Sequence, residues 1–159
     1  MMKLRTRTGL IASAIVAVLA LSGCVGAVPM DAVPDSNNPE CAAVTVRLPD
    51  KVADLARRET HAQATGAWGD PAAILLTCGL AKPGPTTLPC VTINNVDWIE
   101  DDSRKPLYTY TTFGREPAVQ VAIDSNTVSG STALVDLSGA VSVLPVTGQC
   151  LSPIDVYNG

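Results

Sequence analysis

The sequence predicts an α+β fold: an antiparallel sheet of about four to five strands, with helices near both ends of the domain and disulfides that staple it. Three observations lead to this prediction. Apolar residues recur at helical spacing shortly after residue 38 and again after residue 130. Between these stretches the apolar pattern alternates, and four cysteines are spread along the same region. Helices at the ends with strands between them are typical of helices packed on one face of an antiparallel sheet.

The first predicted helix begins after Asn38. Asn38 suits the N-cap, Pro39 suits the first helical position, and Cys41, Val44 and Leu48 then share one helical face. A strand is the alternative, because every second residue from Val44 to Leu48 is also apolar.

A second short helix is predicted over residues 50–60. Asp50 can cap it, and Val52, Leu55 and Ala56 lie on one side. The aliphatic run AAILLTCG, residues 72–79, follows a turn-like Trp-Gly-Asp-Pro sequence and predicts a buried strand.

The pattern VTINNVDWI, residues 91–99, predicts a hairpin. The apolar residues Val91 and Ile93 stand at odd positions, whereas Val96 and Trp98 stand at even positions, so the alternation shifts by one residue between them. The Asn-Asn pair at the break fits a two-residue turn, because asparagine tolerates positive φ.

Two further strands and a last helix complete the prediction. Residues 106–114 are rich in aromatic and β-branched residues, and residues 117–124 alternate, so they predict an antiparallel pair. Leu134, Leu137, Val141 and Leu144 recur at helical spacing, and Pro145 ends that helix.

The four cysteines of this region are Cys41, Cys78, Cys90 and Cys150. In an exported chain an even number implies two disulfides, with three connectivities open. A zinc site competes, but no CxxC pair and only one histidine occur. We favour Cys78–Cys90, which closes a loop between two strand-like segments, and Cys41–Cys150, which ties the start of the domain to its end.

Residues 1–23 predict a lipoprotein signal peptide. Lys3, Arg5 and Arg7 precede an uncharged apolar run over residues 10–23. The sequence LSGC at 21–24 resembles a lipobox, which implies cleavage before Cys24 and attachment of lipid to its sulfur. An ordinary signal peptide whose cleavage site happens to contain cysteine is the alternative. Two or more acyl chains anchor stably, so we expect a location on the outer face of the cytoplasmic membrane.

The remaining chain divides into a tether and a domain. Residues 24–40 contain three prolines and no aromatic residue, which predicts a flexible tether, and residues 41–159 suffice for a single globular domain. Three of the eleven basic residues lie before residue 24, so eight remain against fifteen acids, a formal net charge of −7. This charge argues against nucleic acid as a partner.

An ordered set of short motifs carries a family resemblance. These are CAA at 41–43, LP at 48–49, AWGDP at 67–71, CG at 78–79, VDW at 96–98 and TTFGREPAV at 111–119. Together they resemble a family of small secreted or lipid-anchored actinobacterial proteins catalogued only as a domain of unknown function, over residues 41–150. Asn95 stands where that family usually has glycine. The resemblance implies no activity or catalytic residue. The family's genes often lie beside a gene for joining D-alanine to D-alanine, so the resemblance implies, by association only, a role in the cell envelope or cell wall.

Candidates for catalysis are few. His61 lies in a polar stretch that suits a solvated residue, and neither a GxSxG nor an SxxK motif is present. The acidic run Glu100-Asp101-Asp102 lacks the alternating acids and the glycine of a calcium loop. We therefore predict no catalytic residue, metal or cofactor. A hydrolase using two carboxylates stays open, because such pairs are distant in sequence.

A binding surface is the stronger hypothesis. Trp68, Asp70, Asp97, Trp98 and Arg115 would supply stacking surfaces and polar groups for a sugar or peptide if they lined one surface. The alternative is that both tryptophans fill the core, Asp70 serves a turn and Arg115 pairs with an acid. The sequence thus predicts a non-enzymatic binding or accessory module for an envelope protein or a cell-wall glycan or peptide. A small cell-wall hydrolase or a structural accessory of a membrane assembly are the alternatives.

Overall fold

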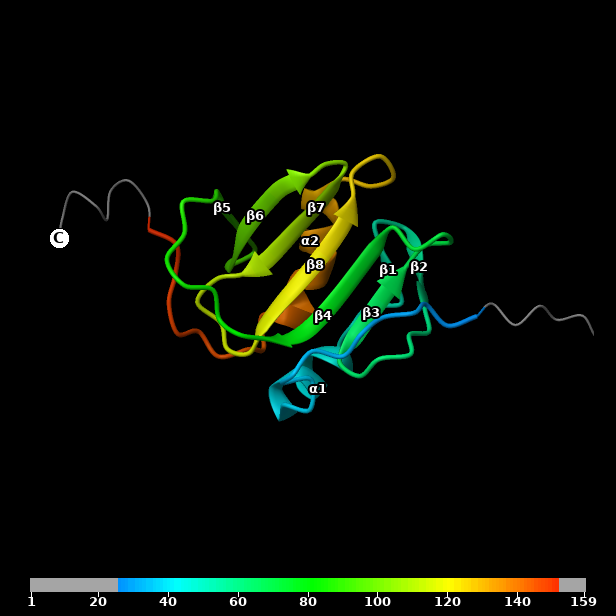
Figure 1. Ribbon diagram of the computed structural model, residues 1–159, viewed down its shortest axis with the longest axis horizontal. Coiled ribbons are helices and arrows are strands. Elements are labelled where there is room, and N and C mark those ends of the chain that lie inside the picture. The colour runs from blue at the N-terminus through cyan, green and yellow to red at the C-terminus, as the bar shows by residue number, and fades with distance from the viewer. Residues whose placement is uncertain (1–25, 152–159) are drawn as a thin grey trace, which may run out of the picture.

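The computed structural model describes residues 26–151, which form one eight-stranded antiparallel sheet and two short helices (Figure 1). The strand order is β1-β2-β3-β4-β8-β7-β6-β5. The elements are α1 (Pro39–Thr45), β1 (Lys51–Val52), β2 (Leu55–Arg58), β3 (Thr65–Trp68), β4 (Ile74–Leu80), β5 (Cys90–Ile93), β6 (Val96–Arg104), β7 (Leu107–Thr112), β8 (Ala118–Asp124) and α2 (Gly130–Val141). The predicted α+β fold with four to five strands is therefore wrong, because strands dominate the described chain. The predicted signal peptide and Cys24 lie outside the described residues.

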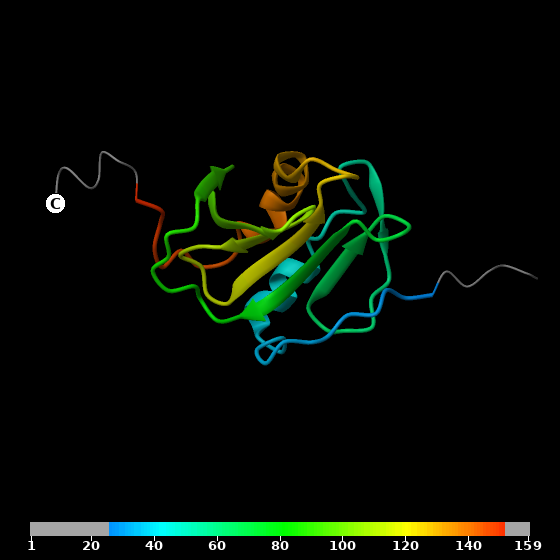
Figure 2. The same ribbon diagram turned by 45° about the horizontal axis from the view of Figure 1, so that its top comes forward.

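Both terminal helices that the sequence predicts are present. The Asn38 side chain accepts a hydrogen bond from the Glu40 amide at 2.9 Å, and Pro39 opens α1. In α2, Leu134, Leu137 and other apolar residues are buried. The two helices lie on the same side of the sheet (Figures 1 and 2), and their buried residues join those of β4 and β8 in one hydrophobic core.

The helix predicted over residues 50–60 is wrong. This stretch forms the β1–β2 hairpin, whose turn places Ala53 and Asp54 at φ 48° and 63°. A carboxylate oxygen of Asp136 in α2 accepts a hydrogen bond from the Ala53 amide at 2.8 Å. A contact 83 residues away along the chain thus holds a turn that the local apolar pattern does not reveal.

The central strands match the predictions more closely. Asn94 and Asn95 occupy the β5–β6 turn at φ 48° and 61°, as the Asn-Asn pair predicts. The predicted strand at 72–79 corresponds to β4, and β7 pairs with β8. The sequence does not predict β3, because its last residue, Trp68, begins the turn-like Trp-Gly-Asp-Pro stretch.

All four cysteines of the domain are in disulfides, but not in the predicted pairs. Cys41 in α1 is bonded to Cys78 in β4, with Cα atoms 5.5 Å apart, and Cys90 is bonded to Cys150, with Cα atoms 6.3 Å apart. Cys41 lies on the buried face of α1, which packs on the sheet beside β4. The packing of α1 therefore selects Cys78 as its partner, a choice that loop lengths alone do not make.

The described chain contacts the domain well before residue 41, the predicted domain boundary. The Val28 amide donates to the Glu59 carbonyl at 2.7 Å, and Val28 forms a parallel bridge with Thr60. The backbone of Asp35 packs directly against Gly79 in β4, where φ is 109° and a Cβ would lie 2.6 Å from the Asp35 backbone. The two ends of the described chain lie at opposite ends of the long axis (Figure 1).

Candidate functional site

The two tryptophans do not form a contact surface. Trp68 and Trp98 are both completely buried. Four steps of the strand order separate β3 from β6, which is about 19 Å at the usual spacing of neighbouring strands. The Trp68 indole N–H donates to the Pro49 carbonyl at 3.0 Å, whereas the Trp98 indole N–H has no hydrogen-bond partner within residues 26–151.

The other polar candidates lie apart from one another at or near the surface. Asp70 forms an ion pair with Arg58 at 2.9 Å, and His61 is exposed beside the segment that contains Val28. Asp102 pairs with Lys105 at 2.6 Å. Hydrogen bonds from Ser103 lower the pKa of Asp101. Within the described chain, no group of three or more His, Cys, Asp or Glu side chains is placed to hold a metal ion.

Two adjoining hollows lie where β5, β6 and β7 meet the segment after α2, residues 142–151, which we call the strap. The smaller hollow has a volume of about 170 Å³ and the larger of about 310 Å³, and they share Phe113 and Gln149 in their walls. We call the pair the strap groove. Its other lining residues are Thr92, Asn95, Asp97, Arg115, Val146 and Gly148 on one side, and Pro85, Thr86, Leu88, Cys90, Ile99, Cys150 and Leu151 on the other.

The strap is held along its length by backbone contacts and one disulfide. Val146 forms an antiparallel bridge with Arg115, and the Thr147 amide donates to the Gly114 carbonyl at 2.7 Å. Gly114 has φ 64°, and a Cβ there would collide with the backbone of Gly148. Together with the Cys90–Cys150 bond, these contacts close the groove on one side.

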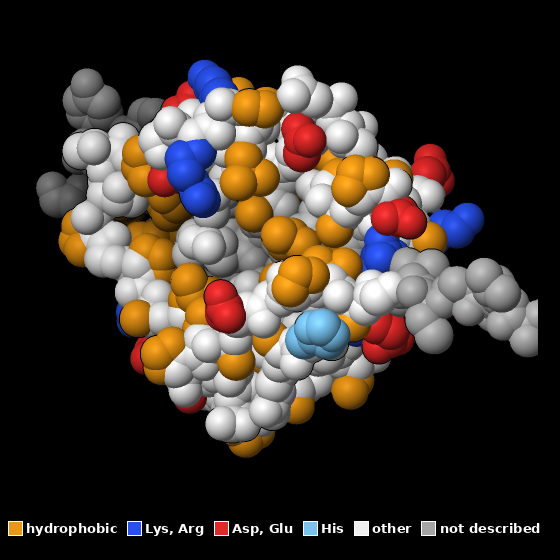
Figure 3. Space-filling view, turned by 45° about the vertical axis from the view of Figure 1, so that its right-hand side comes forward, with side chains coloured by type: hydrophobic (Ala, Val, Ile, Leu, Met, Phe, Trp, Pro, Cys, Tyr) orange, Lys and Arg blue, Asp and Glu red, His pale blue; other side chains and the backbone are white. Residues whose placement is uncertain are grey.

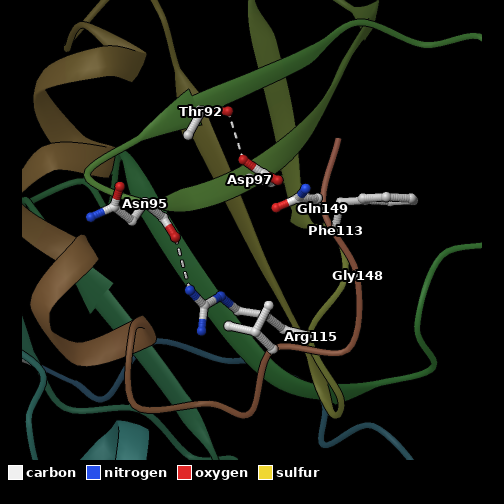
Figure 4. Close-up of a pocket in the computed structure, with 8 residues that line it drawn as sticks. Thr92, Asn95, Asp97, Phe113, Arg115, Gly148 and Gln149 are labelled. Carbon is white, nitrogen blue, oxygen red and sulfur yellow. Dashed lines mark hydrogen bonds between the residues drawn. The ribbon is translucent and has the colours of Figure 1, made fainter. Parts of the chain in front are cut away.

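Arg115 is a buried clip between three segments. Only 4% of the residue is exposed. Its guanidinium donates to the carbonyls of Leu144 at 2.6 Å and Ser142 at 3.3 Å. It also donates to the Asn95 carbonyl at 3.0 Å (Figure 4). Ser142 is the C-cap of α2, where a cation is favourable. Burial lowers the pKa of the Arg115 guanidinium, and the charge of Asp97 opposes that shift.

Asp97 joins the hairpin to the strap. One carboxylate oxygen accepts from the Thr92 hydroxyl at 2.6 Å and the other from the Cys150 amide at 2.7 Å. Figure 4 shows the Gln149 amide beside this carboxylate. Asp97 and Arg115, two of the five residues named from sequence, thus meet in one groove, while Trp68, Asp70 and Trp98 do not take part.

The other half of the groove is apolar and partly open to solvent. Among the described residues, five large hydrophobic side chains are exposed, and three of them line the groove: Leu88, Val146 and Leu151. Sequence reasoning missed Leu88, Phe113, Gln149 and Leu151. Leu88 and Phe113 are far along the chain from Gln149 and Leu151, and the strap brings the four together, so no local pattern signals them.

Charge does not gather elsewhere on the visible surface. The face in Figure 3 mixes acidic, basic and apolar side chains, without a patch of one sign. Neither described helix is long and apolar enough to cross a bilayer. Two disulfides are typical of proteins that fold outside the cytoplasm.

Comparison with known proteins gives a family. The model of a family described as "Protein of unknown function (DUF3515)" matches residues 9–147. The chain belongs to this family. No curated protein and no solved structure matched it. The resemblance to a domain of unknown function is thereby confirmed. The DUF3515 match extends from the apolar N-terminal run into the strap, so it takes in the residues that clip the groove, Asp97 and Arg115.

Proposed function

We propose that this DUF3515 protein is an extracytoplasmic binding module, held to the outer face of the cytoplasmic membrane by lipid on Cys24. Its strap groove binds an uncharged or cationic, partly apolar segment of an envelope component. The observation that carries the proposal is the groove itself, in which an apolar wall with Leu88 and Leu151 adjoins a polar wall with Asp97 and Gln149. Concave sites that join apolar surface to a few polar groups are typical of ligand binding.

The groups in the groove suit binding better than hydrolysis. A glycosidase needs two carboxyl groups about 5–10 Å apart. Asp97 is the one carboxylate among the described lining residues, and both of its oxygens already accept hydrogen bonds from the protein. The charged groups of the groove therefore hold the strap, and Asp97 keeps only its remaining lone pairs for a ligand.

The same contacts select the ligand's charge. The Arg115 guanidinium donates to three backbone carbonyls, so few of its N–H groups are free to bind an anion. The side-chain amide of Gln149 lies beside Asp97 in the wall of the hollow and can both donate and accept (Figure 4). Peptide amides, sugar hydroxyls and amines fit this set, and phosphate groups do not.

Site-specific photocrosslinking in native membranes tests the groove. We would replace Leu88, at the rim, with a benzophenone amino acid, and use Val46, the exposed C-cap residue of α1, as a control position outside the groove. We expect an ultraviolet-dependent adduct with one envelope component from position 88 and none from position 46. Equal adducts at both positions, or none at 88, would contradict the proposal.

The anchor is tested separately by Cys24→Ser. We expect the variant to leave the membrane fraction or to keep its signal peptide, because the sulfur that receives the lipid is gone. Fractionation and intact-mass measurement check this. An unchanged mature mass and unchanged fractionation would refute lipidation at Cys24.

A further inference from the structure

The outer edge of β5 offers unpaired backbone groups. β5 is the last strand of the sheet and pairs only with β6. In a two-residue hairpin the residues flanking the turn form a hydrogen-bonded pair, here Ile93 and Val96, and bonded pairs then alternate. The bond from the Glu100 amide to the Pro89 carbonyl, 2.9 Å, fits this alternation. The amides and carbonyls of Cys90 and Thr92 therefore point away from β6.

This edge lacks the features that usually protect a sheet edge. β5 reads Cys-Val-Thr-Ile, with no charge, no proline and no break in its register with β6. At the opposite edge, β1 is only two residues long, carries Lys51 and is followed by a turn tied to Asp136. Proteins normally block exposed edges with short strands, charges, prolines or bulges. One edge of this sheet is blocked in that way, and the other is left open.

The open edge is also rigid and adjoins the groove. The disulfide to Cys150 fixes the start of β5, and Arg115 holds the Asn95 carbonyl in the turn at its end. A preformed edge costs a ligand less ordering entropy. Cys90 and Thr92 line the two hollows, so a strand paired with β5 presents every second side chain to the face that carries the groove.

We propose that β5 takes an extended peptide segment of a partner protein as a ninth strand, with one apolar side chain of that segment placed against Leu88 and Ile99. The proposal rests on the proposed function and names its ligand class as peptide. Four residues of edge span about 13 Å. Pairing along so short an edge buries far less than the 1,200 Å² or so of a stable dimer, which favours a peptide over a second copy of the chain.

The test uses the purified mature protein and peptides selected against it from a displayed library of random decapeptides. The best peptide is resynthesised in versions that carry one N-methyl group on successive backbone amides. We expect methylation of every second amide to weaken binding by about tenfold or more, and methylation of the amides between them to have little effect, because only alternate amides face β5. Equal effects at all positions would overturn strand addition.

Protein variants give a second readout. Thr92→Pro removes the outward amide, and Thr92→Ala keeps it; both remove the hydroxyl that binds Asp97. We expect Thr92→Pro to bind the peptide about tenfold more weakly than Thr92→Ala. Equal affinities would overturn the proposal. If Thr92→Pro fails to fold by near-ultraviolet circular dichroism, the methylated peptides decide the matter on the wild-type protein.

The remaining outcomes separate the two proposals. If no peptide is enriched while the adduct at position 88 persists, the groove binds something other than peptide, and only strand addition fails. If both are absent, both proposals fail. A concentration-dependent dimer that Thr92→Lys abolishes would make a second copy the occupant of β5 and would overturn the peptide proposal.

Discussion

The two parts of the sheet on either side of β8 are stabilised by different contacts. One half, α1 with β1–β4, contains Trp68 and the Cys41–Cys78 disulfide. The other, β5–β7 with the strap, contains Trp98 and the Cys90–Cys150 disulfide. We call them the α1 half and the groove half. In the α1 half the disulfide is completely buried and the indole N–H of Trp68 is hydrogen-bonded. In the groove half Cys90 is exposed and the indole N–H of Trp98 is unpaired within the described chain.

This difference separates the source of stability from the site of binding. The α1 half is closed by apolar burial. In the groove half Val96, Trp98 and Tyr110 belong to the same buried core, but the strap after Leu144 is largely exposed and is held by one arginine, one aspartate and an accessible disulfide. Regions with few buried apolar contacts open at lower free energy than a core does. We therefore expect the strap to open before the rest of the groove half, whereas β5 stays paired with β6.

The largest expected contrast comes from removing each disulfide. Chain entropy alone predicts a loss of about 4 kcal/mol for either bond, since both close loops of several tens of residues. We expect Cys41→Ala/Cys78→Ala to cost more than Cys90→Ala/Cys150→Ala, because alanines in place of the buried pair also leave a cavity. Urea unfolding measures both free energies. A larger loss from the exposed pair would break the comparison.

A related measurement follows reduction of the native protein. Under mild dithiothreitol, we expect alkylation to label Cys90 and Cys150 before Cys41 and Cys78, because only the first bond includes an exposed cysteine. Simultaneous labelling of all four would show that the strap does not open independently.

The next contrast compares two arginines. Arg115→Met leaves three carbonyls without their charged donor and should lower the free energy of unfolding by about 3 kcal/mol. Arg58→Met loses an ion pair with the exposed Asp70 and two carbonyl contacts at the surface, and should cost about 1 kcal/mol. Urea unfolding checks the order. Arg115→Met should also speed proteolysis within residues 142–151, and an unchanged cleavage pattern would argue against its role as a clip.

A smaller contrast is expected between the tryptophans. Trp68→Phe removes the donor to Pro49, whereas Trp98→Phe removes an N–H that has no partner in the described residues. Both changes reduce packing, so their difference isolates the hydrogen bond. We expect Trp68→Phe to be the more destabilising by about 1–2 kcal/mol. Equal losses would mean that the Trp98 indole is satisfied in solution, for example by a buried water.

The smallest effect concerns the β5–β6 turn. Asn95 lies at φ 61°, where glycine is less strained, so Asn95→Gly should stabilise the protein by about 0.5 kcal/mol. Asn94→Gly, at the first turn position, should change stability less. Thermal unfolding of the three proteins checks this. Destabilisation by Asn95→Gly would mean that its side chain makes a contact the turn needs.

The parts of the fold that the sequence predicts are those governed by neighbours along the chain. The Asn38 cap and the Asn94-Asn95 turn depend on residues within a few positions, and both were predicted. The β1–β2 hairpin was not, because Asp136 stabilises it from a distant helix. The disulfide pairing depends on which strand α1 covers. That is a property of the tertiary structure, so local sequence does not reveal it.

In the candidate site, too, the sequence identifies single residues but not the tertiary contacts that decide their roles. The sequence predicts Asp97 and Arg115 as polar groups for a ligand, and in the structure their side chains hold the strap. The sequence predicts Trp68 and Trp98 as stacking surfaces, and in the structure both are core residues. Leu88 and Gln149 join the groove through the loop before β5 and the segment after α2, which no residue-level pattern connects.

The contact of Val28 with the β2–β3 connection fixes the start of the described chain to one end of the domain. Arg58 also holds the Gly26 carbonyl at 3.1 Å, so the described chain begins fixed to the α1 half. The strap groove and β5 lie at the opposite end of the long axis (Figure 1). If Cys24 carries the lipid that we propose, the open edge of β5 lies at the end of the domain that is far from the tether.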